Sequence, residues 1–594
     1  MERNDKLIKS KFYKYLLPGI MMVAAMQLGN LVDSIFVGNF LGSDALSAIN
    51  LGMPVVQISQ IPILIMAVGG SIVSGICLGK RDMKKASAIY TAAMISVLLI
   101  NIVNAVSACF YCRPLADILS GGGSLMAMTC DFMWFYLIGM PFVGISLMIS
   151  YFMSVDNHPF ESAALHIVAN GINLVADYVF ILIFSMGIKA SALSTVAGYS
   201  ISGIIFGIVY LKSPKRTLKL IPKEAFKDSQ LIKDAVKNGL SSGMIIVLGA
   251  VKMMILNAAI LVTTGDTGMA LYAVCVNSSF LIQLCLHGVS GVIQTVAGVL
   301  YGEKDYFGIR VVLKHVLKLC LMISALLTAL FIAAPGMIEG MFGFDIPEQT
   351  RLMDLCLRVY ALSFIGYALN NIMQTYYSTI EKPFYATLNT VLQGLVILVP
   401  VTLALLPATG VVGTSIGAVV AETGAFIIVT VVRIVMQKKG TAEGSKFDML
   451  PEKQNERFVD VTVKGNIHDA AGIAHKLREY CEREGINPRS ANIVAVAGEE
   501  LVNNIACYGD KKRSYIDVCL VKEEEKLVLR VRDDGPFFNP LEYGSGKEAE
   551  TDDDIEGLSG IKIIKSLADR LDYSRVLNMN NTIVEISARI GDER

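Results

Sequence analysis

Gly79-Lys80-Arg81-Asp82 ends one long apolar stretch of this sequence, and Gly302-Glu303-Lys304-Asp305 ends another, 223 residues later. A second pair repeats the pattern: Pro159-Phe160 and Pro383-Phe384 each open an apolar stretch, 224 residues apart. The near-constant offset indicates that the chain contains two related halves. Parallel repeats of hydrophobic segments around a central site are a transporter architecture.

Twelve segments contain the roughly 20 apolar residues that are needed to cross the hydrocarbon core of a bilayer. They lie at 16–40, 48–78, 89–112, 127–153, 160–184, 190–211, 238–262, 268–300, 312–335, 354–378, 384–406 and 411–436. We therefore expect an all-α membrane domain over residues 1–440, built of twelve transmembrane helices in two six-helix repeats, about 10–212 and 232–438.

The charge of the chain is divided unevenly between its two ends. Residues 1–440 carry 30 Lys and Arg against 22 Asp and Glu, whereas residues 441–594 carry 22 against 30. The overall net charge of zero is therefore only the sum of two opposite charges. The uneven division excludes a single soluble domain, a disordered chain and a nucleic-acid binder. Lys and Arg collect in the first tail and the even-numbered loops, which places both termini and the acidic tail in the cytoplasm.

Ordered motifs run through the first half. They are Leu17-Pro18-Gly19, Asp33, Val37-Gly38-Asn39, Asp156-Asn157-His158-Pro159, the set Asn170, Asn173 and Asp177, and the stretch from Gly187 to Thr195. With the duplication, this order resembles the multidrug and toxic-compound extrusion (MATE) family of efflux transporters over about residues 10–440. The resemblance implies an antiporter that exports small organic, cationic compounds in exchange for Na⁺ or H⁺. We expect a multi-pass plasma-membrane protein of bacterial origin.

Acidic residues inside a membrane are costly and indicate function. Asp33 lies midway along the first predicted span, and Asp177 follows Asn173 by four residues, on one helix face. Two nearby carboxylates cannot both stay ionised without a cation, so such a pair can bind Na⁺ or share a proton. The resemblance places Asp33, Asn173, Asp177 and Thr195 at the cation site of the first half. Satisfied structural polar residues are the alternative.

The second half has no carboxylate at the matching positions. The repeat offsets carry Asp33, Asn173 and Asp177 onto Leu256, Ile397 and Val401. Two other charged residues lie in its predicted spans. Lys252 is expected to tune the substrate's charge preference, to act as a counter-ion or simply to snorkel, and Glu422 to line the cavity or to be structural.

The tail begins with a linker over 441–455 and continues as a domain over 456–594. Alternating apolar residues predict strands at 458–463, 515–521, 526–532 and 582–587, and helical periodicity appears at 467–485, 488–507 and 558–569. This mixture predicts an α+β domain with a layered sheet-and-helix sandwich, large enough for its own core.

Three motifs of the tail predict binding of ATP with Mg²⁺. In the stretch from Gly498 to Asn504, Glu499 can orient or deprotonate a nucleophile, and Asn503, four residues later, can give Mg²⁺ an oxygen. Asp533 can accept from the adenine amino group, with Gly535 permitting close approach. Gly557 to Gly560 is expected to open a helix whose backbone N–H groups hold phosphate. The segment from Gly544 to Glu556 is interpreted as a lid.

These motifs together resemble the histidine-kinase-like ATPase fold over about residues 455–590, most closely the anti-sigma-factor serine kinases. Phe537 and Leu558-Ser559 depart from that subfamily's usual residues. The resemblance implies that the domain either regulates transport or phosphorylates Ser or Thr of a cytoplasmic protein. Nucleotide binding without turnover is the alternative for the domain. For the whole chain, the alternative is a membrane receptor kinase whose transporter-like part senses a ligand without moving it.

Overall fold

A computed structural model describes residues 3–120, 123, 125–337, 350–439, 449–450, 458–464, 467–508, 515–523, 526–541 and 552–588. The chain divides into two compact units. One unit is Phe12–Ala442, and the other combines Met1–Lys11 with Glu443–Arg594.

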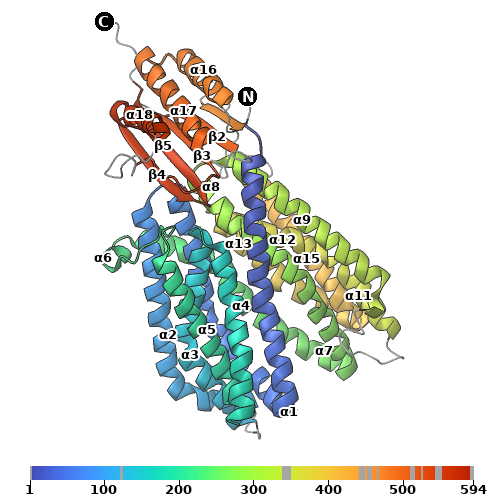
Figure 1. Ribbon diagram of the computed structural model, residues 1–594. Coiled ribbons are helices and arrows are strands. Elements are labelled where there is room, and N and C mark those ends of the chain that lie inside the picture. Colours follow the sequence, from blue (N-terminus) through green and yellow to red (C-terminus); the bar gives the residue numbers. More distant parts are fainter. Residues whose placement is uncertain are drawn as a thin grey trace. The chain divides into compact units, whose positions relative to one another are not determined.

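In the larger unit, all the regular secondary structure of the described residues is helical. The elements of its first half are α1 (Lys6–Gly79), α2 (Met83–Ser120), α3 (Met126–Val155), α4 (Pro159–Asp177), the π-helix η1 (Tyr178–Ile183) and α5 (Lys189–Lys212). The short helix α6 (Pro222–Ala225) lies in the connection to the second half. Helices α2, α3, α4 and α5 pack against one another as one group (Figure 1).

The second half forms a separate group of helices, in which α9, α12 and α15 lie side by side (Figure 1). Its elements are α7 (Ser229–Val292), η2 (Ile293–Ala297), α8 (Gly298–Gly302), α9 (Tyr306–Ala333), α11 (Thr350–Ala361), α12 (Ser363–Thr379), α13 (Pro383–Val391), η3 (Leu392–Val396), α14 (Leu398–Thr409) and α15 (Val412–Lys438). Helix α7 is broken at Gly265, where φ is 65° and ψ is −165°. Glycine tolerates this conformation because it has no Cβ.

Among the described residues, eleven helical stretches are long and apolar enough to cross a membrane. They coincide with the second to twelfth predicted spans. The first predicted span, 16–40, falls inside α1, where the side chains of several residues lie outside the described set. The all-α membrane fold expected from the sequence is confirmed.

Backbone conformation repeats between the two halves. Residues with positive φ end corresponding segments in pairs: Arg81 and Lys304, Asn157 and Glu381, and Gly187 and Gly410, with offsets of 223, 224 and 223 residues. Arg81 and Lys304 are each followed by an aspartate that caps the next helix. Asp82 Oδ1 accepts a 2.9 Å hydrogen bond from Lys85 N, and Asp305 Oδ1 accepts one of 2.9 Å from Gly308 N. The internal repeat read from the sequence is therefore a repeat of structure.

The two halves meet closely where α1 and α8 end. A Cβ atom on Gly79 would lie 2.0 Å from the carbonyl oxygen of Val299, and one on Gly302 would lie 2.0 Å from that of Ile76. No other residue type fits at this distance, so these two equivalent glycines allow backbone to pack on backbone. This explains why the same glycine recurs in the two motifs that define the repeat.

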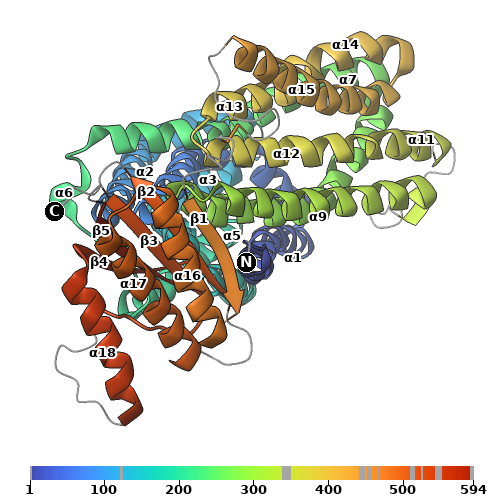
Figure 2. The ribbon, with the colours of Figure 1, turned by 90° about the horizontal axis from the view of Figure 1, so that it is seen from above.

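The smaller unit contains a five-stranded antiparallel sheet in the order β1-β2-β3-β5-β4. Its elements are β1 (Phe458–Lys464), α16 (Ile467–Arg483), α17 (Pro488–Tyr508), β2 (Tyr515–Glu523), β3 (Lys526–Asp533), α18 (Asp552–Leu567), β4 (Arg570–Val576) and β5 (Met579–Ser587). Helices α16 and α17 lie side by side over the sheet (Figure 2). Apolar side chains from both layers form one buried core, as expected for an α+β sandwich.

Two details of this unit differ from the sequence prediction. Strand β4 was not predicted, because Arg570, Asp572 and Arg575 interrupt its apolar pattern. Helix α18 begins at Asp552, so Gly557 lies inside the helix, and the prediction that Gly557 opens the helix is wrong.

The first residues of the chain pack within the smaller unit. Arg3 Nη1 lies 2.7 Å from Asp460 Oδ2, and Arg3 Nη2 lies 3.6 Å from Asp517 Oδ2. Arg532 also pairs with Asp517, at 3.3 Å. The backbone N–H of Asn4 donates a 3.0 Å hydrogen bond to Thr462 Oγ1. These buried charges are therefore compensated across β1, β2 and β3.

Candidate functional site

A buried polar cluster joins the end of α4 to the beginning of α5 in the first half. The Asp177 side chain is fully buried, and its Oδ1 accepts a short hydrogen bond from Ser194 Oγ. Asn173 Nδ2 donates to Ser194 Oγ at 3.2 Å and to Thr195 Oγ1 at 3.3 Å. The structure thus brings together three of the four residues expected to form the cation site.

Ser194 belongs to this cluster but was missed by the sequence reasoning. It lies one position before Thr195, and its hydroxyl group contacts both Asp177 and Asn173. The signal was present in the sequence, since Ser191, Ser194 and Thr195 recur at spacings of three and four residues, on one helix face. Carboxylate, amide and hydroxyl oxygens are the ligands that hard cations prefer.

Asp33 lies in α1, and its side chain is outside the described residues. Nearby, the structure does place α1 against α4. Asn170 Nδ2 donates a 2.5 Å hydrogen bond to the carbonyl oxygen of Ala25, and a Cβ atom on Gly29 would lie 2.3 Å from Asn170 Oδ1. Asp33 follows Gly29 by four residues along this helix.

A larger cavity, of about 280 Å³, lies wholly within the second half. Its walls come from α7, from α11 to α15 and from the π-helix η3, and Lys252 and Glu422 both line it. Asn370 Nδ2 donates a 2.7 Å hydrogen bond to Glu422 Oε2. Glu422 therefore lines the cavity, as one of the two sequence interpretations held, and supplies a carboxylate that the repeat offsets did not locate.

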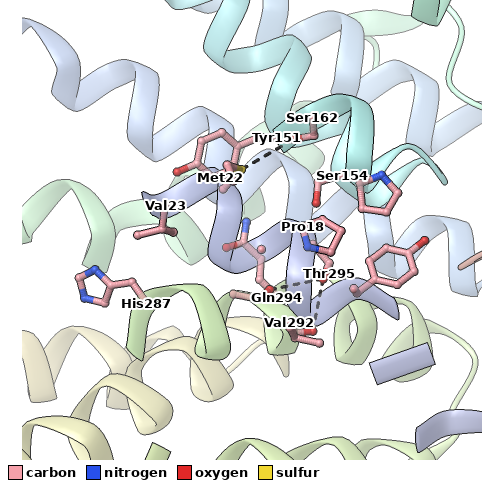
Figure 3. Close-up of a pocket in the computed structure, with 14 residues that line it drawn as sticks. Pro18, Met22, Val23, Tyr151, Ser154, Ser162, His287, Val292, Gln294 and Thr295 are labelled. Carbon is pink, nitrogen blue, oxygen red and sulfur yellow. Dashed lines mark hydrogen bonds between the residues drawn. The ribbon is translucent and has the colours of Figure 1, made fainter. Parts of the chain in front are cut away.

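A second, smaller cavity of about 40 Å³ lies where the two halves meet (Figure 3). Met22 and Tyr151 come to it from the first half, and His287 and Gln294 from the second. Ser162 Oγ contacts the sulfur of Met22 at 3.7 Å, and His287 also lines the larger cavity. One histidine of α7 thus borders both spaces.

The candidate nucleotide site of the smaller unit centres on Asp533, at the end of β3. Asp533 Oδ1 accepts hydrogen bonds from the backbone N–H of Gly535 at 2.8 Å and from Asn580 Nδ2 at 3.0 Å. Asn580 Nδ2 also donates to the carbonyl oxygen of Pro536 at 2.7 Å. Burial raises the pKa of Asp533 to about 6, although the two hydrogen bonds oppose the rise. Asp533 is therefore a buried carboxyl group that two hydrogen bonds hold in place, as a hydrogen-bond acceptor for a ligand requires.

Helix α17 supplies the second part of this site. Glu499 and Asn503 lie one turn apart, and the Asn503 Oδ1 atom is buried without a hydrogen-bond partner among the described residues. Burial and the neighbouring Glu499 charge raise the pKa of Glu500. A Cβ atom on Gly560 would lie 2.0 Å from Glu500 Oε2, so α18 packs closely on α17 here. The first and third motifs are thus adjacent. Of the predicted lid, residues 544–551 lie outside the described residues, and the rest belongs to α18.

Two family models match the chain. The MatE model matches residues 18–179 and 243–406, once in each half, and the histidine kinase-like ATPase domain model matches residues 465–587. The two MatE matches begin and end within the two structural halves described above. The ATPase match covers helices α16 to α18 and strands β2 to β5, whereas strand β1 lies just before it.

Curated relatives are similar to the helical part of the chain. The multidrug export protein MepA of Staphylococcus haemolyticus (strain JCSC1435) is 24% identical over 412 residues, which cover 67% of this chain and 88% of the relative. MepA of Staphylococcus aureus (strain MRSA252) is 21% identical over 436 residues, covering 71% of this chain and 94% of the relative.

Solved structures share the fold of the same part. A crystal structure of MATE in complex with MaL6 has a TM-score of 0.68 at 18% identity and covers 73% of this chain and 98% of that chain. An outward-facing conformation of a multidrug resistance MATE family transporter of the MOP superfamily has a TM-score of 0.67 at 17% identity, covering 74% and 98%. The duplicated helical fold and the family match in each half lead to one conclusion: this multi-pass membrane protein belongs to the MatE family, with a histidine kinase-like ATPase domain at its C-terminal end.

Proposed function

We propose that the protein is a cation-coupled antiporter that exports small organic compounds with a cationic group in exchange for Na⁺ or H⁺. The observation that carries this proposal is the fully buried Asp177, grouped with Asn173, Ser194 and Thr195. A pure ligand sensor has no need of such a site, which favours transport over the receptor alternative. The multidrug export named for the MepA relatives supports the same direction.

In this proposal the cation or proton binds at Asp177. A buried, ionised carboxylate is costly in a low-dielectric environment, and a bound cation or proton removes that cost. Asn173 and Thr195 supply further oxygen atoms, and Ser194 orients the carboxylate. We assign Asp33 as the second carboxylate because it lies on α1, which packs on α4 at Gly29 and Asn170.

The coupling step follows from the charge of this site. Its occupied and empty states differ by one positive charge, and that difference favours different arrangements of the two halves. Exchange then requires that the organic compound and the cation bind to opposite arrangements. The excess of Lys and Arg in the even-numbered loops supports an orientation with both termini in the cytoplasm.

For the C-terminal domain we propose ATP binding with Mg²⁺. Asp533 and Gly535 would hold the adenine end, Asn503 would give Mg²⁺ an oxygen, and Gly560 lies on the helix that closes the site. Asn503 Oδ1 is buried and has no hydrogen-bond partner among the described residues, which fits a role as a metal ligand. Bound ATP would supply a transferable phosphoryl group, and Glu499 would orient or deprotonate a hydroxyl group. The domain then regulates transport or phosphorylates Ser or Thr of a cytoplasmic protein.

One experiment separates the parts of this proposal. The purified full chain is reconstituted in liposomes, and efflux of a fluorescent organic cation, ethidium, is followed while Na⁺, pH and ATP are varied one at a time. We expect a Na⁺ or proton gradient to drive efflux in the absence of ATP. Efflux that requires ATP and ignores both gradients would contradict the antiporter.

The nucleotide proposal is tested by binding of Mg-ATP to the same protein. Asn503→Ala is expected to weaken binding about tenfold or more, because a ligand of the metal is lost. Asn492→Ala is the matched control, since Asn492 is an exposed asparagine of the same helix. Full affinity in Asn503→Ala would overturn the assignment.

A further inference from the structure

The cavity of the second half carries two opposite charges. Lys252 of α7 and Glu422 of α15 both line this space of about 280 Å³. They are close enough for electrostatic interaction but lie more than 4.0 Å apart, since no ion pair joins these two described residues. Both charged side chains therefore line one cavity without forming an ion pair with each other.

Lys252 is the less satisfied member of this pair. Glu422 Oε2 accepts a hydrogen bond from Asn370, at 2.7 Å. Among the residues that the structure describes, Lys252 has neither a hydrogen-bond partner nor an ion-pair partner. Removing a charged group from water costs free energy unless the group is paired. An anionic group of a ligand would therefore stabilise the Lys252 ammonium.

Snorkelling does not explain Lys252. The residue lies 13 positions before Gly265, where α7 breaks. At about 1.5 Å of rise per residue, this is about 20 Å along the helix axis. A lysine side chain is too short to cover that distance, and Lys252 contributes to the cavity wall instead.

The rest of the wall suits an organic molecule. Tyr272, Tyr360, Phe364 and Tyr367 line the cavity together with aliphatic residues such as Leu248. Ligand pockets typically combine such apolar and aromatic walls with a few placed polar groups. The two charged groups are therefore the features that select a ligand by its charge.

We propose that this cavity binds zwitterionic organic compounds, with the ligand's ammonium group facing Glu422 and its carboxylate or other anionic group facing Lys252. Such a ligand compensates both charges at once, whereas a simple cation leaves Lys252 unpaired and a simple anion leaves Glu422 unpaired. The inference rests on the proposed function, because it takes the cavity as a place where the exported compound binds. It refines the substrate class from cations to compounds that also carry a negative group.

The test uses three fluorescent probes with the same body and different charges. Nε-dansyl-lysine carries an ammonium and a carboxylate group, its methyl ester carries the ammonium alone, and its Nα-acetyl derivative carries the carboxylate alone. Binding to the purified full chain in detergent is followed by dansyl fluorescence. We expect the zwitterion to bind about tenfold or more tightly than either derivative, since each charged contact adds a factor of that order.

Two charge-neutral variants assign the charges. Lys252→Gln should remove the advantage of the zwitterion over the methyl ester, and Glu422→Gln should remove its advantage over the acetyl derivative. Lys318→Gln and Glu381→Gln are the matched controls, because these residues are exposed and do not line the cavity. The wild-type comparison stands on its own if a variant fails to fold.

The outcomes are distinct for the two proposals. Absence of zwitterion binding, equal affinity for the methyl ester, or an unchanged affinity ratio in a folded Lys252→Gln would overturn the zwitterion site. Charge-selective binding without gradient-driven efflux would support the site and contradict the antiporter. Gradient-driven efflux of ethidium without any zwitterion preference would support the antiporter and contradict the zwitterion site.

Discussion

Gln294 Nε2 donates a 2.8 Å hydrogen bond to Ser71 Oγ, and these two residues are 223 positions apart, the offset that relates the two halves. Equivalent residues of a parallel repeat touch each other only near the axis that relates the repeats. Gly79 and Gly302 are also 223 positions apart, and their backbones pack against each other. These pairs therefore mark the line about which the halves approach each other, and along which they must part if transport uses alternating access.

This contact predicts that a covalent link between the halves blocks transport. In a background without the native cysteines, joining Ser71→Cys to Gln294→Cys with a short, reducible thiol cross-linker should stop efflux, because the link holds the halves together. A reductant should restore efflux. The single variant Ser71→Cys is the control, and continued efflux by fully cross-linked protein would show that the halves do not separate here.

The glycine contact predicts a second effect on the same motion. Gly302→Ala should weaken the observed arrangement by about 1–3 kcal/mol, because its Cβ would overlap the carbonyl oxygen of Ile76. The change is measured as a lower midpoint of thermal unfolding or as altered accessibility of a cysteine at position 71. Gly171→Ala is the control, since no atom lies within 4 Å of its added Cβ. Equal behaviour of the two variants would argue against the contact.

Ser194 is predicted to act through Asp177. Ser194→Ala removes a hydrogen bond to a buried carboxylate, which typically contributes about 1.5–3 kcal/mol. We expect the concentration of Na⁺ or H⁺ that gives half-maximal efflux to shift about tenfold. Ser200→Ala is a matched control, because Ser200 Oγ donates only to the Val196 carbonyl of its own helix. The same shift in both variants would contradict a specific role for Ser194.

Asp533 predicts a pH dependence of nucleotide binding. Its pKa is about 6 in the folded domain against an ordinary 3.8, because burial favours the neutral form. The carboxylate acceptor is therefore lost as pH falls through 6, and ATP affinity should drop between pH 7 and pH 5. Asp533→Asn should remove this step, whereas Asp534→Asn should keep it. A step that persists in Asp533→Asn would assign the titration to another group.

The same pKa has a consequence for stability. Because the folded-state pKa is raised, the contribution of Asp533 to stability is complete below pH 3.8 and is lost as pH rises through 6. Nucleotide affinity and the contribution of this group to stability thus change in opposite directions with pH. This opposition is expected where a buried carboxyl group is kept for binding.

The sequence predicted the membrane part well because its signals are long. A span of about 20 apolar residues and an offset of 223 residues between matching motifs survive uncertainty at any single position. Eleven spans and the duplication followed from such patterns. Asn173 and Thr195, which the structure brings into contact, were expected together only from the family resemblance.

Shorter signals failed for physical reasons. Strand β4 (Arg570–Val576) is held by its pairing with β5, which no local pattern of its charged residues reveals. Helix α18 begins at Asp552, inside the acidic segment whose composition predicts a lid. Lys252 and Glu422 are 170 positions apart, and only folding places them around one cavity.

The central claim is that Asp177 couples cation entry to efflux, and gradient-driven efflux by Asp177→Asn in liposomes tests it most directly. Asp117→Asn serves as the control, because Asp117 is an exposed carboxylate of the same half. We expect Asp177→Asn to fold and bind substrate but to lose efflux driven by either Na⁺ or protons, while Asp117→Asn transports normally. Unchanged gradient-driven efflux in folded Asp177→Asn would contradict the account.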